Sequence, residues 1–156
     1  MTVVDESGAP PLELNVAKLT EAVATAFPDR DCLVFRDRRS SWADVADRTR
    51  RLAALLHLAD LGIRAPFGSV ERWESVHDHV ALYLHNGNEY LEGMLGAWKA
   101  RCAPFNVNYR YVAEELRYLL DDASAAAIIV HECFTPVLAD VLDSLHRRPS
   151  LILQVS

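Results

Sequence analysis

The sequence predicts an α/β fold in which a mostly parallel sheet is flanked by helices, and three observations support this. Strand and helix patterns alternate along the chain, which is the order that produces parallel sheets. Val80–Leu84 is an unbroken apolar run, typical of a parallel strand covered on both faces. The chain has 156 residues, 51% of them hydrophobic and 24% charged, which suits one globular domain.

The first dozen residues show no helix or strand pattern. Residues 1–12 contain Gly8, Pro10 and Pro11, and we expect them to form a flexible N-terminal arm. The folded region is expected to begin at residue 13. Asn15 is a suitable N-cap for the first helix, whose apolar residues recur at helical spacing as far as Phe27.

A strand, a second helix and a loop are predicted next. Residues 32–35 are typical of a short strand, and a charged turn follows at residues 37–39. Ser41–Asp44 has the pattern of a capping box and predicts the start of a helix. We expect that helix to end at Leu61–Gly62. Residues 64–78 have no regular period and predict a loop.

The second half of the chain repeats the strand–helix order. After the apolar run that ends at Leu84, Asn88 is expected to cap a helix that continues to Trp98. The remaining predicted elements are a strand at 103–107, a helix at 112–120, a strand at 125–130, a helix from Pro136 to Leu145, and a strand at 151–155.

Charge and composition argue against several classes of protein. The formal net charge is -6, with 22 acidic and 16 basic residues, which argues against nucleic-acid binding. No apolar run approaches the roughly 20 residues that a membrane-spanning helix needs, and no segment has the pattern of a targeting signal. Cys32, Cys102 and Cys133 are odd in number and widely spaced, so we expect a reducing, cytoplasmic location.

Polar side chains follow several predicted strands, at the sheet edge where α/β proteins usually bind ligands. These candidate residues are His85, Asn86, Asn88, Asn106, Asn108, His131 and Cys133. Asparagine and histidine are also common turn residues, so a structural role is the simpler interpretation for each of them.

Two groups of side chains suggest specific chemistry, but each has a weakness. His77–Asp78–His79, with His85 nearby, could hold a metal ion, yet no second ligand cluster stands at a recognised spacing. His131 and Cys133 could act as base and nucleophile, but we expect their side chains to diverge where the strand emerges. Glycine-rich phosphate loops and the G-x-S-x-G elbow have no match. The residues alone therefore predict no catalytic constellation.

Five short motifs, in order, resemble the N-terminal region of AMP-forming acyl-CoA synthetases of the adenylate-forming ligase superfamily. They are F-P-D-R at 27–30, S-W-A-D-V at 41–45, N-G-N-E-Y at 86–90, P-F-N-V-N at 104–108 and E-E-L-R-Y-L-L at 114–120. The segment N-V-N-Y-R-Y at 106–111, followed by E-E-L-R-Y-L-L at 114–120, is most similar to ligases of fatty-acid or steroid side-chain breakdown. The resemblance implies that residues 13–156 are a truncated, partial N-terminal domain of such a ligase.

The resemblance also implies a reaction. In the family, a carboxylic acid attacks ATP to give an acyl-adenylate and pyrophosphate, and coenzyme A then displaces AMP. The complete enzyme would therefore use ATP, magnesium and coenzyme A. The family's Ser/Thr/Gly-rich phosphate loop, Y-G-x-T-E segment, ribose-binding aspartate and C-terminal lysine have no match in this sequence. We therefore assign no catalytic, cofactor-binding or metal-binding residue, and we expect no cofactor on this chain.

One departure from the family pattern has a structural consequence. Arg101 stands where the family usually has glycine, and an arginine there is strained if the backbone needs a positive φ.

Three interpretations of function follow from the sequence. The favoured one is an N-terminal fragment of an acyl-CoA ligase that is inactive alone. In the second, the chain is half of a split ligase and binds a separate chain that carries the adenylation motifs, or it forms a homo-oligomer. The third is a non-catalytic module that binds acyl groups or nucleotides.

Overall fold

The computed structural model describes residues 15–156, so the predicted arm at residues 1–12 and the predicted domain start at residue 13 lie outside the described residues. The helices are α1 (Val16–Ala26), α2 (Trp42–Leu58), α3 (Asn88–Lys99), α4 (Ala113–Asp122) and α5 (Thr135–Leu142), with a short 3-10 helix η1 (Glu132–Phe134). The strands are β1 (Asp31–Phe35), β2 (Arg38–Ser41), β3 (His79–Tyr83), β4 (Ala103–Asn106), β5 (Ala125–His131) and β6 (Leu151–Val155).

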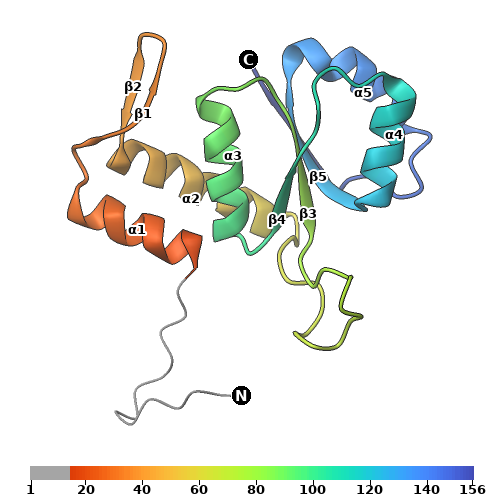
Figure 1. Ribbon diagram of the computed structural model, residues 1–156, viewed down its shortest axis with the longest axis horizontal. Helices are drawn as coiled ribbons and strands as arrows, with labels where there is room; N and C mark the ends of the chain where they lie inside the picture. Colours follow the sequence, from red (N-terminus) through yellow and green to blue (C-terminus); the bar gives the residue numbers. More distant parts are fainter. Residues whose placement is uncertain (1–14) are drawn as a thin grey trace.

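Four strands form one parallel sheet in the order β4-β3-β5-β6. Helices α1, α2 and α3 lie on one side of this sheet, and α4 and α5 lie on the other (Figure 1). The predicted α/β fold with a mostly parallel, helix-flanked sheet is therefore confirmed. The predicted loop at residues 64–78 is also confirmed, and an isolated antiparallel bridge between Ile63 and His77 closes its base.

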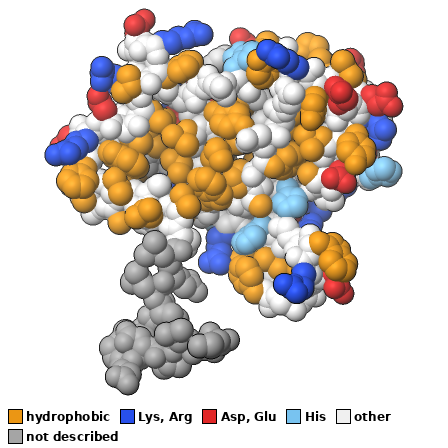
Figure 2. Space-filling view, viewed as in Figure 1, with side chains coloured by type: hydrophobic (Ala, Val, Ile, Leu, Met, Phe, Trp, Pro, Cys, Tyr) orange, Lys and Arg blue, Asp and Glu red, His pale blue; other side chains and the backbone are white. Residues whose placement is uncertain are grey.

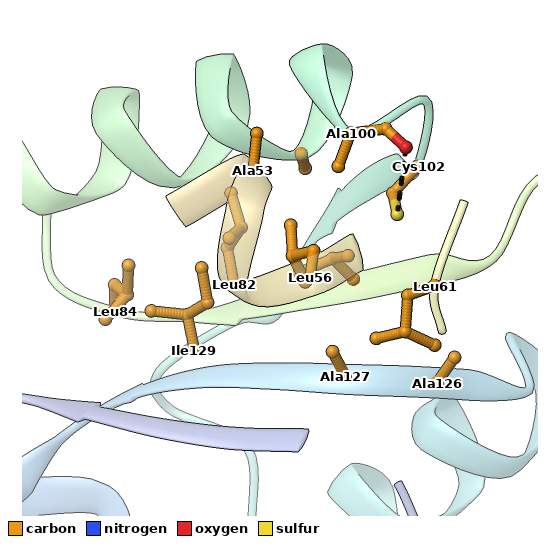
Figure 3. Close-up of a cluster of buried hydrophobic side chains, with 12 residues drawn as sticks. Ala53, Leu56, Leu61, Leu82, Leu84, Ala100, Cys102, Ala126, Ala127 and Ile129 are labelled. Carbon is orange, nitrogen blue, oxygen red and sulfur yellow. Dashed lines mark hydrogen bonds between the residues drawn. The ribbon is translucent and has the colours of Figure 1, made fainter. Parts of the chain in front are cut away.

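The two central strands are covered on both faces, which explains their unbroken apolar sequences. On β3, Val80 and Leu82 belong to the core beneath α2 and α3, whereas Ala81 and Tyr83 belong to the core beneath α4 and α5. Figure 3 shows Leu56 of α2 among the side chains of the first core. Successive side chains of a strand point to opposite faces, so one apolar run serves two cores.

Helices α2 and α3 pack closely enough to require a glycine. A Cβ atom on Gly96 would lie 2.5 Å from Cδ2 of Leu52, well inside van der Waals contact. On the same pair of helices, the Arg48 guanidinium donates two hydrogen bonds of 2.7 Å to the carboxylate of Glu92, which is only 6% exposed. A close apolar contact and a bidentate ion pair therefore both fix α3 against α2.

The first strand does not belong to the parallel sheet. We predicted a charged turn at residues 37–39, but Arg38 and Arg39 lie in β2, which pairs with β1 as an antiparallel hairpin. This prediction was wrong because β2 is short and polar, with only Ser40 fully buried, so its sequence lacks the apolar alternation of a strand. Asp37 does lie in the turn, which it forms with Arg36, whose φ is 53°.

Helix ends also differ from the predictions. Helix α2 ends at Leu58, and the left-handed residue that follows is Asp60, with a φ of 58°, rather than Gly62. The N-cap of α3 is Gly87, which leaves Asn88 inside the first turn. Helix α5 ends at Leu142, before Leu145. Aspartate and asparagine can adopt left-handed backbone, and several residue types can cap a helix. The local sequence therefore did not fix the residues at which these helices begin and end.

Candidate functional site

The carboxyl edge of the sheet holds the main group of chemically active side chains. Strand β3 leads into His85, β4 leads into Tyr109, and β5 ends at His131, with Cys133 and Phe134 in the η1 turn. We call these five residues the carboxyl-edge cluster. The rings in this cluster contact one another: the His85 ring centroid lies 5.0 Å from that of Tyr109 and 5.3 Å from that of His131.

The thiol of Cys133 contacts His85 rather than His131, the histidine two residues before it in the sequence. Its Sγ lies 3.6 Å from Nε2 of His85, although the two residues are 48 positions apart in the chain. His131 instead accepts a hydrogen bond at Nδ1 from the backbone N–H of Cys133, at 3.3 Å. Because β5 ends at His131 and Cys133 lies in the following turn, the two side chains diverge.

Phe134 organises the aromatic part of the cluster. Its ring stacks on that of Tyr83 with centroids 4.7 Å apart and lies 4.6 Å from the ring of His85. Tyr83 is almost fully buried, and burial, together with the nearby Cys133 thiol, raises the pKa of its hydroxyl. The ring contacts restrict the orientation of His85 and so hold its Nε2 beside the thiol. Sequence spacing did not point to Phe134, because its role depends on contacts across the sheet edge.

The predicted asparagines do not converge on this cluster. Asn108 accepts a hydrogen bond at Oδ1 from the backbone N–H of Arg110, which stabilises a turn. Asn86 and Asn106 are exposed. Asn88 is 3% exposed, and its Nδ2 has no hydrogen-bond partner among the described residues. Its side chain is therefore buried and is not presented to solvent at the sheet edge.

The His77–Asp78–His79 segment has structural partners rather than a metal-binding arrangement. The Asp78 carboxylate accepts a hydrogen bond from the Gly62 backbone N–H at 3.1 Å. Nδ1 of His77 lies 2.6 Å from the carbonyl of Arg101, and Nδ1 of His79 lies 2.5 Å from that of Ala123. Carbonyl oxygens only accept, so both Nδ1 atoms carry the proton. Within residues 15–156, no group of three or more possible ligands is placed to hold a metal ion.

A second polar network joins the first three helices and was not predicted. The Lys99 ammonium of α3 donates a 2.7 Å hydrogen bond to Oγ1 of Thr49 and forms an ion pair with Glu21 of α1. Arg50 of α2 also pairs with Glu21. Burial alone would raise the pKa of Glu21, but the hydrogen bonds from Arg50 and Lys99 outweigh it and lower that pKa.

Apolar surface gathers on the helical face that carries α1 and α3 (Figure 2). Val16 and Leu19 of α1 and Leu91 of α3 are exposed. A hollow of about 650 Å³ lies beside this surface, where Val16, Trp98 and Cys102 contribute to its wall. It lies at the amino end of the sheet, near the start of β4, and not at the carboxyl-edge cluster.

The described residues do not fit an ATP site. Phosphate sites need converging backbone N–H groups of a glycine-rich loop or basic side chains. At the carboxyl-edge cluster the nearby cation is Arg110, and its guanidinium stacks over the Tyr109 ring at 5.5 Å. Gly87, at the start of α3, has the Glu89 carboxylate beside it, which opposes an anion there. We therefore assign no nucleotide, magnesium or coenzyme A contact to this part of the chain.

No helix within residues 15–156 is long and apolar enough to span a bilayer. Residues 20–156 match the family model described as AMP-binding enzyme. The chain is 45% identical over 138 residues to the medium-chain acyl-CoA ligase Mig of Mycobacterium avium, covering 88% of this chain and 25% of that protein. A medium/long-chain-fatty-acid and 3-oxocholest-4-en-26-oate CoA ligase of Mycobacterium tuberculosis is 35% identical, with 90% and 24% covered. The chain thus spans about a quarter of these relatives' length.

Solved structures agree at the level of fold. The anthranilate CoA ligase AuaEII, in complex with anthranoyl-AMP, superposes with a TM-score of 0.78 at 18% identity, covering 97% of this chain and 27% of that one. A fatty acyl CoA synthetase of Mycobacterium tuberculosis gives a TM-score of 0.73 at 21% identity, with 90% and 26% covered. The resemblance to acyl-CoA ligases is confirmed, and this chain belongs to the AMP-binding enzyme family.

Proposed function

We propose that this chain supplies the N-terminal part of the large domain of an AMP-forming acyl-CoA ligase that acts on fatty or steroid-derived acids. The 45% identity to the medium-chain acyl-CoA ligase of Mycobacterium avium is the observation that carries the proposal. The match to the Mycobacterium tuberculosis ligase, which is named for both medium/long-chain fatty acids and 3-oxocholest-4-en-26-oate, supports the same range of acids. The ligase would work in the cytoplasm with ATP, magnesium and coenzyme A.

We further propose that this chain is inactive alone. The carboxyl-edge cluster offers a thiol, two imidazoles and aromatic rings, but the described residues provide no phosphate-binding loop and no metal site. Acyl-adenylate formation concentrates negative charge on the α-phosphate as pyrophosphate leaves, so it depends on groups that stabilise that charge. Those groups would come from another part of the ligase.

A complementing polypeptide is the partner that fits this proposal. Val16 and Leu19 of α1 and Leu91 of α3 are exposed apolar side chains. Exposed apolar patches of this kind commonly mark surfaces that bind protein. We therefore propose that this helical face packs against the ligase region that carries the adenylation motifs, and self-association through the same face is an alternative outcome of the test below.

A chimera tests the family function directly. Residues 20–156 of this chain replace the matching region of the Mycobacterium avium ligase, and acid-dependent AMP formation is measured with medium-chain acids. We expect activity to be retained. The control chimera carries Glu92→Lys, which replaces the carboxylate bound by Arg48 with a second positive charge. This repulsion should loosen α3 from α2, so the activity of the control should fall. A chimera that folds but forms no AMP would contradict the proposed function.

The purified chain tests the second claim. We expect no acid-dependent AMP formation by the chain alone, and AMP formation above the no-acid background would refute its inactivity. Sedimentation with and without the remaining part of the Mycobacterium avium ligase tests the partner. A stable one-to-one complex supports a complementing polypeptide, whereas a homodimer without that addition, or a monomer with it, contradicts this choice.

A further inference from the structure

The three cysteines differ sharply in accessibility. Cys133 is exposed, Cys32 is half-buried and Cys102 is buried. Burial raises the pKa of the Cys102 thiol to about 11, with a smaller contribution from Asp78, and burial also raises the pKa of Cys32. Thiol chemistry requires the thiolate and access to a reagent, so both features disfavour Cys32 and Cys102.

Cys133 has an imidazole in contact with it. Nε2 of His85 lies 3.6 Å from Sγ, within the range of a sulfur hydrogen bond. The His85 ring lies against those of Phe134 and Tyr109, at centroid distances of 4.6 and 5.0 Å, and those two rings stack on each other at 6.1 Å. A nucleophile beside an oriented imidazole is the arrangement that activates cysteine in proteins generally. Here it is assembled from the ends of two neighbouring strands, β3 and β5.

The remaining groups around the thiol shape its access. The backbone N–H of Cys133 is bonded to His131, which fixes the η1 turn. Glu132, the next residue back in that turn, is exposed, and Arg110 stacks on Tyr109 at the rim. The rim of the site therefore carries one acidic and one basic side chain and is open to water, which suits a small, polar reagent.

We infer that Cys133 is a site of reversible thiolation by low-molecular-weight disulfides, with His85 as the base. The Cys133 proton moves to Nε2 of His85, and the thiolate attacks one sulfur of the disulfide. A new S–S bond forms as the original S–S bond breaks, and the departing thiolate takes the proton from the imidazolium. The balance is one protein thiol and one disulfide giving one mixed disulfide and one free thiol.

This inference is independent of the proposed ligase function. A mixed disulfide would place a bulky polar group on the carboxyl edge of the sheet, next to the rings of Tyr109 and Phe134. The attached group is removed by any excess thiol, so the change is reversible.

The test treats the full chain with glutathione disulfide and follows each cysteine by intact mass and peptide mapping. We expect Cys133 to react about tenfold faster than Cys32, because thiolate availability and exposure set the rate. His85→Gln keeps a polar side chain that cannot take the proton, and it should slow Cys133 about tenfold, less than general bases usually contribute because the site is open. Cys32→Ser is the matched control and should leave the fast reaction unchanged.

Two results would overturn the inference. One is equal modification of Cys32 and Cys133 in the folded wild-type chain. The other is an unchanged Cys133 rate in His85→Gln with a native urea midpoint. If His85→Gln does not fold, the reaction rates of Cys133 and Cys32 are compared in the wild type, first folded and then in urea. All three thiols should react alike in urea, so a faster Cys133 in the folded chain alone shows that the fold selects it.

Discussion

Arg101 occupies a backbone conformation that suits glycine, and this makes the end of α3 the best place to test the energetics of the fold. Its φ is 61°, in the left-handed region. Its N–H donates to the Trp98 carbonyl, and the N–H of Cys102 donates to that of Ala97, which together form a Schellman motif. The family resemblance identified this position as one where glycine is usual, and the structure shows why.

Replacing Arg101 with glycine should stabilise the chain. Left-handed backbone destabilises a residue with a Cβ by about 1–2 kcal/mol, and glycine avoids this cost. Glycine also makes the unfolded chain more flexible, which lowers the free energy of unfolding by about 0.4–1 kcal/mol. We expect a net gain of about 0.5–1 kcal/mol, because the contact between the Arg101 carbonyl and His77 involves only backbone on the arginine side. The melting temperature should rise by about 2 °C in a chain of this size.

Urea unfolding of the wild type, Arg101→Gly and Arg101→Ala measures this effect. Arg101→Ala removes the same exposed side chain but keeps the Cβ, so its free energy of unfolding should stay within about 0.5 kcal/mol of the wild type. The reasoning is refuted if alanine stabilises as much as glycine, because the gain would then come from losing the arginine side chain. It is also refuted if glycine destabilises the chain.

Two further predictions concern the packing of the first three helices. Gly96→Ala should lower the free energy of unfolding by about 1–3 kcal/mol, because its Cβ would overlap Leu52; an unchanged urea midpoint would contradict the close α2–α3 contact. The pKa of Glu21 is lowered by Arg50 and Lys99, so its contribution to stability is present above its ordinary pKa of 4.5 and is lost as the pH falls below that value. Urea midpoints between pH 7 and 3 should therefore fall more steeply for the wild type than for Glu21→Gln, and parallel curves would contradict this.

The elements that the sequence predicted well are those whose burial follows a simple period. The apolar run of β3 predicted a buried parallel strand, because both of its faces are covered. The Ser41 capping box predicted the start of α2, and the structure shows both of its hydrogen bonds. The short polar strand β2 carries no such period, and it was missed.

The candidate site was predicted only in part. His85, His131 and Cys133 were expected at the carboxyl edge, and the structure brings them together there. The contact between His85 and Cys133 was not expected, because it depends on β3 and β5 being neighbours in the sheet. Phe134, which holds the His85 ring, was missed for the same reason.

The sequence by itself determined the class of the fold, the family and the residue types at the sheet edge, because apolar periods, caps and ordered motifs are local properties of the chain. Only the tertiary structure decided which of those residues meet. Strand order placed the ends of β3 and β5 side by side, and close helix packing set Gly96 against Leu52 and brought Glu21 to Lys99 and Arg50. Such contacts join residues far apart in sequence, so their energies are set by the packed geometry and leave no local pattern.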